Sequence, residues 1–85
     1  MNTIPELREA FGYVLRNYRE LAGFTQVGLA EKIGGAEITI RTLERGSSAP
    51  SLESFLLIAE ALEKDPRDLL GEVLTRMAFL RESRK

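Results

Sequence analysis

The chain has 85 residues, of which 44% are hydrophobic, so it forms one small domain with a modest core. It contains no cysteine and no histidine, which excludes disulfides, thiolate chemistry and the commonest zinc ligand, and we predict no catalytic residue, metal or cofactor. The formal net charge of −1 argues against a non-specific nucleic-acid coat, although a sequence-specific binder can still gather its cations on one face.

Apolar residues at helical spacing begin close to the N-terminus. Thr3 is placed to cap a helix, with Glu6 three residues later as in a capping box, and Pro5 is tolerated in a first turn. Gly23 stands where a helix would stop, so we predict a first helix over about 5–22. Its apolar stripe comprises Leu7, Phe11, Val14, Leu15, Tyr18 and Leu21.

Two shorter helices are predicted on either side of the pair Gly34-Gly35, over about 26–33 and about 36–44. Thr25 caps the first of them, and Gly34 can take the positive φ of a tight turn without a Cβ clash. This arrangement is what a helix-turn-helix requires. The outer face of the second helix carries Ile38, Arg41, Thr42 and Arg45.

Three further helices complete the predicted chain. Ser51 caps a helix over about 52–63, and Asp65 caps a short fifth helix. Gly71 is expected to interrupt this helix, and a last helix follows over about 72–84. The apolar stripe of the fourth helix comprises Leu52, Phe55, Ile58, Ala59 and Leu62.

Three stretches resemble the lambda-repressor-like helix-turn-helix family, which includes Cro, phage repressors and XRE-type regulators: "LRNYRELAGFTQVGLAEKIG", "ITIRTLERG" and "APSLESFLLIAEALEKDPRDLL". They follow one another with the spacing of the family over roughly residues 10–70. The resemblance implies an all-α, five-helix lambda-repressor-like DNA-binding domain over residues 1–71, with an added C-terminal helix over 72–85 as a dimerisation element. It also implies that the helix at about 36–44 enters the major groove of DNA as the recognition helix.

Base contacts are expected on this recognition helix. Glu37 and Ile38 match family positions that often touch base edges, where Glu37 would accept from a cytosine amino group and Ile38 would pack on a thymine methyl. Arg41 would contact guanine or phosphate, and Thr42 a base edge. The alternatives for Glu37 are an ion pair with Arg41 four residues later or complementation of the helix dipole, and the alternative for Arg41 and Thr42 is a solvated helix face.

Phosphate contacts are expected around the recognition helix. In similar proteins the residue that matches Gln26 bonds a phosphate beside the N-terminus of its helix, and the alternative is an exposed polar residue in a first turn. The residues Arg45, Ser47 and Ser48 lie in or next to a loop that commonly contacts the DNA backbone in the family.

The resemblance also assigns a structural pair and draws attention to three departures. Arg19 and Glu44 match an internal salt bridge that ties the first helix to the end of the recognition helix. Gly28 replaces a helix-favouring residue and Gly35 a common apolar one. Ala36 stands where Ser or Thr usually caps the recognition helix, a loss that costs about 0.5–2 kcal/mol.

The segment "GEVLTRMAFLRESRK" lies beyond most of the family match and carries its own apolar stripe. We expect this stripe to form a homodimer surface, and the alternative is that the helix folds back on its own domain. The predicted dimerisation residues are Leu70, Val73, Leu74, Met77 and Leu80.

These features predict a transcriptional regulator, most simply a repressor that binds double-stranded DNA at an inverted-repeat operator as a homodimer. The alternative is a protein-interaction module, such as an antitoxin, with the same fold. An enzyme is not expected, because the serines and carboxylates have no histidine or cysteine to work with and no Gly-rich phosphate loop is present. The N-terminus "MNTIPELREAF" lacks the apolar stretch of a signal peptide, which favours a cytoplasmic protein.

Overall fold

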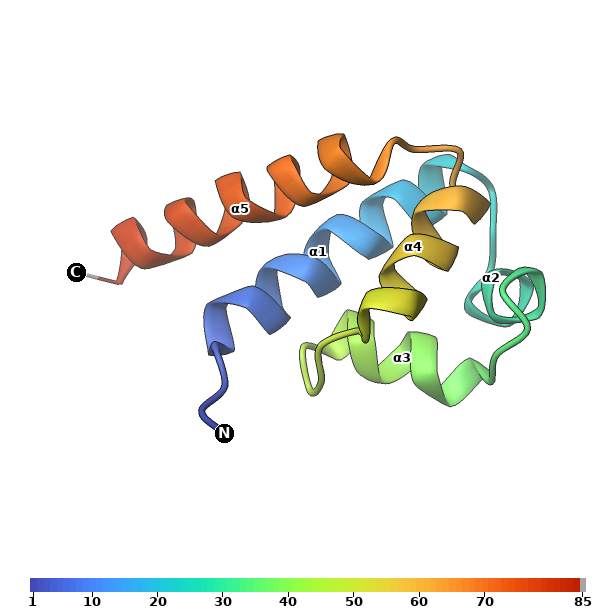
Figure 1. Cartoon of the computed structure of the whole chain (residues 1–85), viewed down its shortest axis with the longest axis horizontal. Helices are drawn as coiled ribbons and strands as arrows, with labels where there is room; N and C mark the ends of the chain where they lie inside the picture. The colour runs from blue at the N-terminus through green and yellow to red at the C-terminus, as the bar shows by residue number, and fades with distance from the viewer. Residues whose placement is uncertain (85) are drawn as a thin grey trace.

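The computed structural model describes residues 1–84, which form five helices joined by short loops and contain no strand (Figure 1). The predicted all-α class is therefore confirmed. The helices are α1 (Pro5–Leu21), α2 (Gln26–Lys32), α3 (Glu37–Arg45), α4 (Leu52–Ala61) and α5 (Pro66–Ser83).

Helix α1 lies at the centre of the molecule. Helix α5 packs along its length, α3 packs against it from another side, and α2 and α4 complete the assembly (Figure 1). The core is continuous through all five helices, and its most deeply buried large side chains are Phe11, Leu15, Leu29, Ile40, Leu43, Ile58, Leu69 and Val73.

The contact between α1 and α3 depends on Gly12. A Cβ atom at this position would lie 2.6 Å from the carbonyl oxygen of Leu43 and 2.7 Å from that of Glu44. Only glycine allows the two backbones to approach so closely, and this distance sets where the end of α3 lies against α1.

Side-chain caps fix the starts of three helices. Thr25, Ser51 and Asp65 each accept a hydrogen bond from a backbone N–H in the first turn, at 2.9, 3.0 and 2.8 Å respectively, as the sequence predicted. The predicted cap at Thr3 is wrong, because α1 begins after Ile4, which provides no side-chain cap.

Helix α5 runs without a break from Pro66 to Ser83, so the interruption predicted at Gly71 is wrong. A glycine inside a helix costs only about 1 kcal/mol relative to alanine, and burial of Leu69 and Val73 against α1 on either side of Gly71 outweighs that cost. Residues 72–83 therefore continue α5 and supply part of the core.

This packing corrects the dimerisation prediction. Val73, Met77 and Leu80 face α1 and are buried within the single chain, so they are not free to meet a second copy. Leu70 and Leu74 lie on another side of α5 and remain 44% and 52% exposed. The C-terminal helix thus folds back on its own domain and leaves only part of its predicted stripe at the surface.

Two residues of the predicted core stripes are also exposed. Leu21 lies on the last turn of α1 and is 81% exposed, while Leu52 lies on the first turn of α4 and is 75% exposed. Both stand at helix ends, where the neighbouring helices no longer cover the stripe that the helical period predicts.

Candidate nucleic-acid interface

Helices α2 and α3 form the predicted helix-turn-helix. The turn contains Gly34 at φ 72°, a left-handed conformation that suits glycine, and the N–H of Gly35 donates to the carbonyl of Ala30 at 2.8 Å. Helix α3 begins after Ala36, which makes no side-chain cap, and ends at Gly46 with φ 78°. The structure thus confirms that α3 starts without the side-chain cap whose loss the sequence indicated.

A polar network anchors the far end of α3. Arg19 Nε donates to Glu44 Oε2 at 2.5 Å and Arg19 Nη2 to Glu44 Oε1 at 3.0 Å, while Arg19 Nη1 donates to the carbonyl of Phe24 at 2.8 Å. The hydrogen bond to Glu44 raises the pKa of Arg19, and both side chains are almost fully buried. The two hydrogen bonds between Arg19 and Glu44 tie α1 to α3 and fix the orientation of α3, the predicted recognition helix.

Gln26 belongs to the same network. Its side-chain amide donates to Glu44 Oε1 at 3.1 Å, and the side chain is half-buried at the first position of α2. An amide nitrogen carries two hydrogens, so this bond orients the group and leaves one donor available. This bond was not predicted, because Gln26 and Glu44 are 18 positions apart in the chain.

The four predicted residues on the outer side of α3 do share one surface. Ile38 is 55% exposed, Arg41 and Arg45 are exposed, and Thr42 is half-buried. Thr39 is also exposed on this helix and was not among the predicted residues. The surface therefore combines two guanidinium groups, an isolated apolar side chain and small hydroxyl groups.

Glu37 and Arg41 form an ion pair across one turn of α3, with Arg41 Nη2 2.7 Å from Glu37 Oε1. This is the alternative that the sequence left open for Glu37. The pair is about half exposed and holds the guanidinium of Arg41 beside the helix. Neither group is locked away from a ligand, because both remain accessible to solvent.

The loop after α3 lies beside the start of α1. Ser47 is exposed and Ser48 half-buried, and the carbonyl of Ser47 accepts a hydrogen bond from Arg8 Nη1 at 3.4 Å. Thr42 Oγ1 donates to the carbonyl of Thr39 at 3.0 Å. Arg8 was not predicted as part of this region, since its position in the first turns of α1 carries no local sign of a contact with residue 47.

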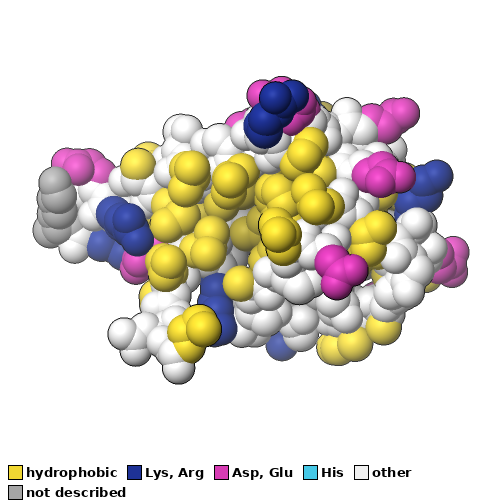
Figure 2. All heavy atoms as spheres, viewed as in Figure 1, with side chains coloured by type: hydrophobic (Ala, Val, Ile, Leu, Met, Phe, Trp, Pro, Cys, Tyr) yellow, Lys and Arg dark blue, Asp and Glu magenta, His cyan; other side chains and the backbone are white. Residues whose placement is uncertain are grey.

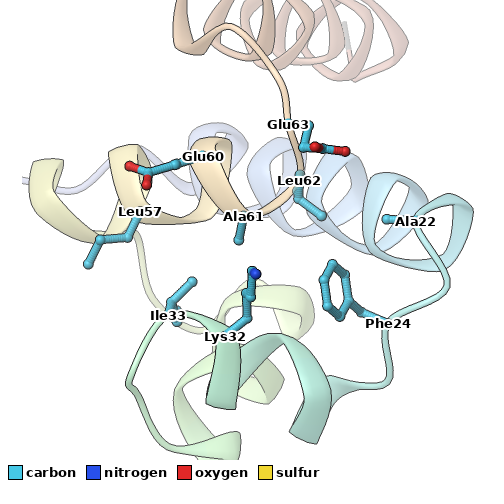
Figure 3. A pocket seen from close by; sticks show the side chains of 9 residues that line it. All are labelled: Ala22, Phe24, Lys32, Ile33, Leu57, Glu60, Ala61, Leu62 and Glu63. Carbon is cyan, nitrogen blue, oxygen red and sulfur yellow. The ribbon is translucent and has the colours of Figure 1, made fainter.

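A separate hollow of about 500 Å³ lies between α2 and α4 (Figure 3). The side chain of Lys32 points into it beside Ala61 and Phe24, and the carboxylates of Glu60 and Glu63 lie at its edge. Small-molecule sites are mostly apolar with a few polar groups, whereas charged side chains occupy much of this hollow. It therefore differs from the interface on α3 in both place and chemistry.

Residues 1–84 contain no helix long and apolar enough to cross a membrane and no group of three potential acidic, histidine or cysteine metal ligands.

Comparisons with known proteins agree with this geometry. A model of the Helix-turn-helix family matches residues 15–69. An uncharacterized HTH-type transcriptional regulator from Methanothermobacter thermautotrophicus is 40% identical over 52 residues, which cover 61% of this chain and 75% of the relative.

Two solved structures extend the likeness to most of the chain. The clp gene regulator ClgR from Corynebacterium glutamicum is 33% identical with a TM-score of 0.84, over 92% of this chain and 83% of that one. The restriction-modification controller protein C.AhdI from Aeromonas hydrophila is 35% identical with a TM-score of 0.70, over 73% and 94% of the two chains.

Proposed function

Because this chain belongs to the helix-turn-helix family of DNA-binding transcriptional regulators, which are not enzymes, we propose that it is a cytoplasmic repressor that binds an inverted-repeat operator as a homodimer. The related structures support a regulatory role, since one is a regulator of clp genes and the other controls restriction and modification.

The observation that carries the proposal is the exposed surface of α3. Arg41 would read guanine through two parallel hydrogen bonds, Ile38 would pack on a thymine methyl, and Thr42 would contact a base edge. Glu37 would either accept from a cytosine amino group or continue to orient Arg41, to which it is bound at 2.7 Å. Ile38 is 55% exposed on this outward face, and an exposed isoleucine there supports a role in base contact.

Phosphate contacts would hold α3 in register. Gln26 has a donor left after its bond to Glu44, and it stands at the N-terminus of α2, where free backbone N–H groups favour an anion. Arg45, Ser47 and Ser48 would contact the phosphates at the other end of α3. These contacts position the domain and carry no sequence information themselves.

The apolar surface where α4 and α5 meet would bring two copies together. Figure 2 shows apolar side chains gathered on the face that contains these helices. Leu52 and Leu70 line one groove there, and Leu56 and Leu74 follow each of them by one turn. We define these four residues as the α4–α5 apolar face. It replaces the stripe predicted from the sequence, of which it keeps only Leu70 and Leu74.

The proposal is tested by selecting bound sequences from a random DNA duplex pool and titrating the winner at two salt concentrations. We expect an inverted repeat with half-sites about 34 Å apart and an affinity that falls steeply with salt. Enrichment of a single half-site would contradict the dimer. If the folded protein enriches no sequence, the alternative of an antitoxin or another protein-interaction module gains support.

A further inference from the structure

A second apolar groove lies between α1 and α5, away from both α3 and the α4–α5 apolar face. Its volume is about 530 Å³, and Tyr13, Val14, Leu21 and Phe79 form its apolar walls. Tyr13, Leu21 and Phe79 are 48%, 81% and 55% exposed, which is unusual for side chains of this size. We call this surface the α1–α5 groove.

Arg76 lies in this groove between two aromatic rings. The centre of its guanidinium is 3.8 Å from the ring centroid of Tyr13 and 4.6 Å from that of Phe79. The rings attract the flat faces of the guanidinium, but its N–H donors point outward in its plane and need acceptors at the edge. Arg76 Nε is buried and has no hydrogen-bond partner among residues 1–84.

Among residues 1–84, the one carboxylate that lines the groove is not paired with Arg76. Glu72 is the only acid among the described residues that line it, and its Oε2 accepts the hydroxyl hydrogen of Tyr18. This bond raises the pKa of Tyr18 and takes up one of the two oxygens of the Glu72 carboxylate. Within residues 1–84, no carboxylate forms an ion pair with Arg76, whereas six other arginines of the chain have such a partner.

From these observations we propose that the α1–α5 groove docks a peptide segment of a second protein, in which an Asp or Glu stands beside apolar side chains. The carboxylate binds the terminal Nη1 and Nη2 groups of Arg76 as a fork of two charge-assisted hydrogen bonds, since Nε is buried. The apolar side chains cover Leu21, Val14 and the exposed rings. Charge complementarity selects the acid, and the flat aromatic walls select the apolar neighbours.

A second copy of this chain fits the groove poorly. In a symmetric dimer the groove would meet itself, so each Arg76 would face a surface whose one acid is already bound to Tyr18. The exposed aromatic residues at such a surface would be paired, while the guanidinium charges of both arginines would still lack a carboxylate partner. A foreign carboxylate removes this deficit, and for that reason the occupant is a different protein.

The groove is compatible with bound DNA. Gly12 contacts α3, and Asn17, which lines the groove, lies about 140° further around α1 at 3.6 residues per turn. A peptide docked there therefore approaches from a different side of α1 than the recognition helix. The protein would hold its operator and its partner at the same time.

The test uses the full chain as bait in a selection from random peptides displayed on phage. We expect enriched peptides to share an acidic residue next to apolar ones. Replacement of Arg76 by glutamine (R76Q) should lower the affinity for the selected peptides about 10-fold or more, because a hydrogen-bonded charge is lost. R81Q is the matched control on α5 outside the groove, and it should leave peptide affinity unchanged.

Two further measurements make the result decisive. A peptide whose acid is replaced by its amide should bind the wild-type chain more weakly by the same factor. Its affinity for R76Q should equal that of the acidic peptide for R76Q, because the partner of the acid is already absent. Thermal melting by circular dichroism checks that R76Q is folded, and its DNA affinity should be unchanged, so a failure here is distinct from a failure of operator binding.

Three outcomes would overturn the proposal. The first is a folded chain that enriches no peptide, and the second is enriched peptides without an acid or with equal affinity for R76Q. The third comes from sedimentation: if R76Q turns a dimer into a monomer, the groove is occupied by a second copy of the chain.

Discussion

The side chains on α3 are organised before any DNA arrives. Glu37 holds Arg41 across one turn, and Glu44 holds Gln26 while itself paired with Arg19. In both cases a carboxylate restricts a donor that would otherwise sample many rotamers. A donor that is already ordered loses less conformational entropy when it binds, so we expect these pairs to favour affinity for DNA even though they carry negative charge towards the interface.

If Arg41 reads a base, its replacement by alanine should cost about 1–3 kcal/mol of binding free energy and relax the preference at one position of the operator. The measurement is titration of the selected operator and its single-position variants. R67A, an exposed arginine on α5, serves as the control and should bind normally. An equal loss on every sequence would instead make Arg41 a phosphate contact.

Asp65 gives the chain a predictable response to acid. The side chain and backbone N–H of Arg67 donate to it and lower the pKa of Asp65 from 3.8 to about 2. Because its pKa is lower in the folded chain than in the unfolded chain, its contribution to stability is complete above about pH 4 and is lost as the pH falls through about 2.

We therefore expect the difference in melting temperature between the wild type and D65N to shrink as the pH is lowered from about 5 to about 2. Asparagine keeps the capping oxygen but does not titrate, so other carboxylates cancel in the comparison. A difference that stays constant over this range would show that Asp65 makes no titratable contribution.

The helices themselves show what the sequence can and cannot predict. The lambda-repressor-like fold and the positions of α2, α3 and α4 were predicted correctly, because caps such as Thr25 and Ser51 and the turn at Gly34 act locally. The interruption predicted at Gly71 was wrong, because packing of α5 against α1 keeps this segment helical despite the glycine. The close contact of Gly12 with α3 could not be predicted, since only the fold brings residues 43 and 44 next to it.

Some features of the candidate interface could likewise be predicted from the sequence, and others depend on the fold. The common outer face of Ile38, Arg41 and Arg45 follows from the helical period, and the pair of Glu37 with Arg41 follows from their spacing. The bond between Gln26 and the buried carboxylate of Glu44 depends on how α2 crosses α3, which spacing along the chain does not contain.

Gly12 in α1 and Gly71 in α5 should respond in opposite ways to alanine. A Cβ at Gly71 would meet nothing within 4 Å, so G71A should stabilise the protein by about 0.5–1 kcal/mol. G12A would press a methyl group against two backbone oxygens and should destabilise it by about 1–3 kcal/mol. Denaturant unfolding measures both, and a G12A variant as stable as the wild type would contradict the close contact of α1 with α3.

The whole molecule presents two apolar surfaces that the proposals assign to different partners. The α4–α5 apolar face is assigned to a second copy, and the α1–α5 groove to another protein. Truncation after residue 71 does not separate them, because it would remove Val73, Met77 and Leu80 from the core and unfold the chain. Point substitutions on exposed positions are the appropriate probes.

Replacement of Leu74 by glutamate should abolish the dimer and weaken operator binding while the chain stays folded, since this side chain is 52% exposed. Analytical ultracentrifugation gives the oligomeric state, and circular dichroism the fold. L57E is the matched control, because Leu57 is similarly exposed, at 46%, but lines the hollow on the other side of α4. An L74E variant that still sediments as a dimer would remove α5 from the interface.

The position of α5 along α1 also determines when the protein can first act. The ribosome makes α5 after the four other helices, and until it emerges from the exit tunnel the side of α1 that meets Leu69, Val73, Met77 and Leu80 stays uncovered. A nascent chain that contains α1 and α3 but not yet α5 therefore has an uncovered apolar side on the helix that supports α3. If operator binding depends on that support, as we propose, a chain cut short before α5 would compete poorly for the operator.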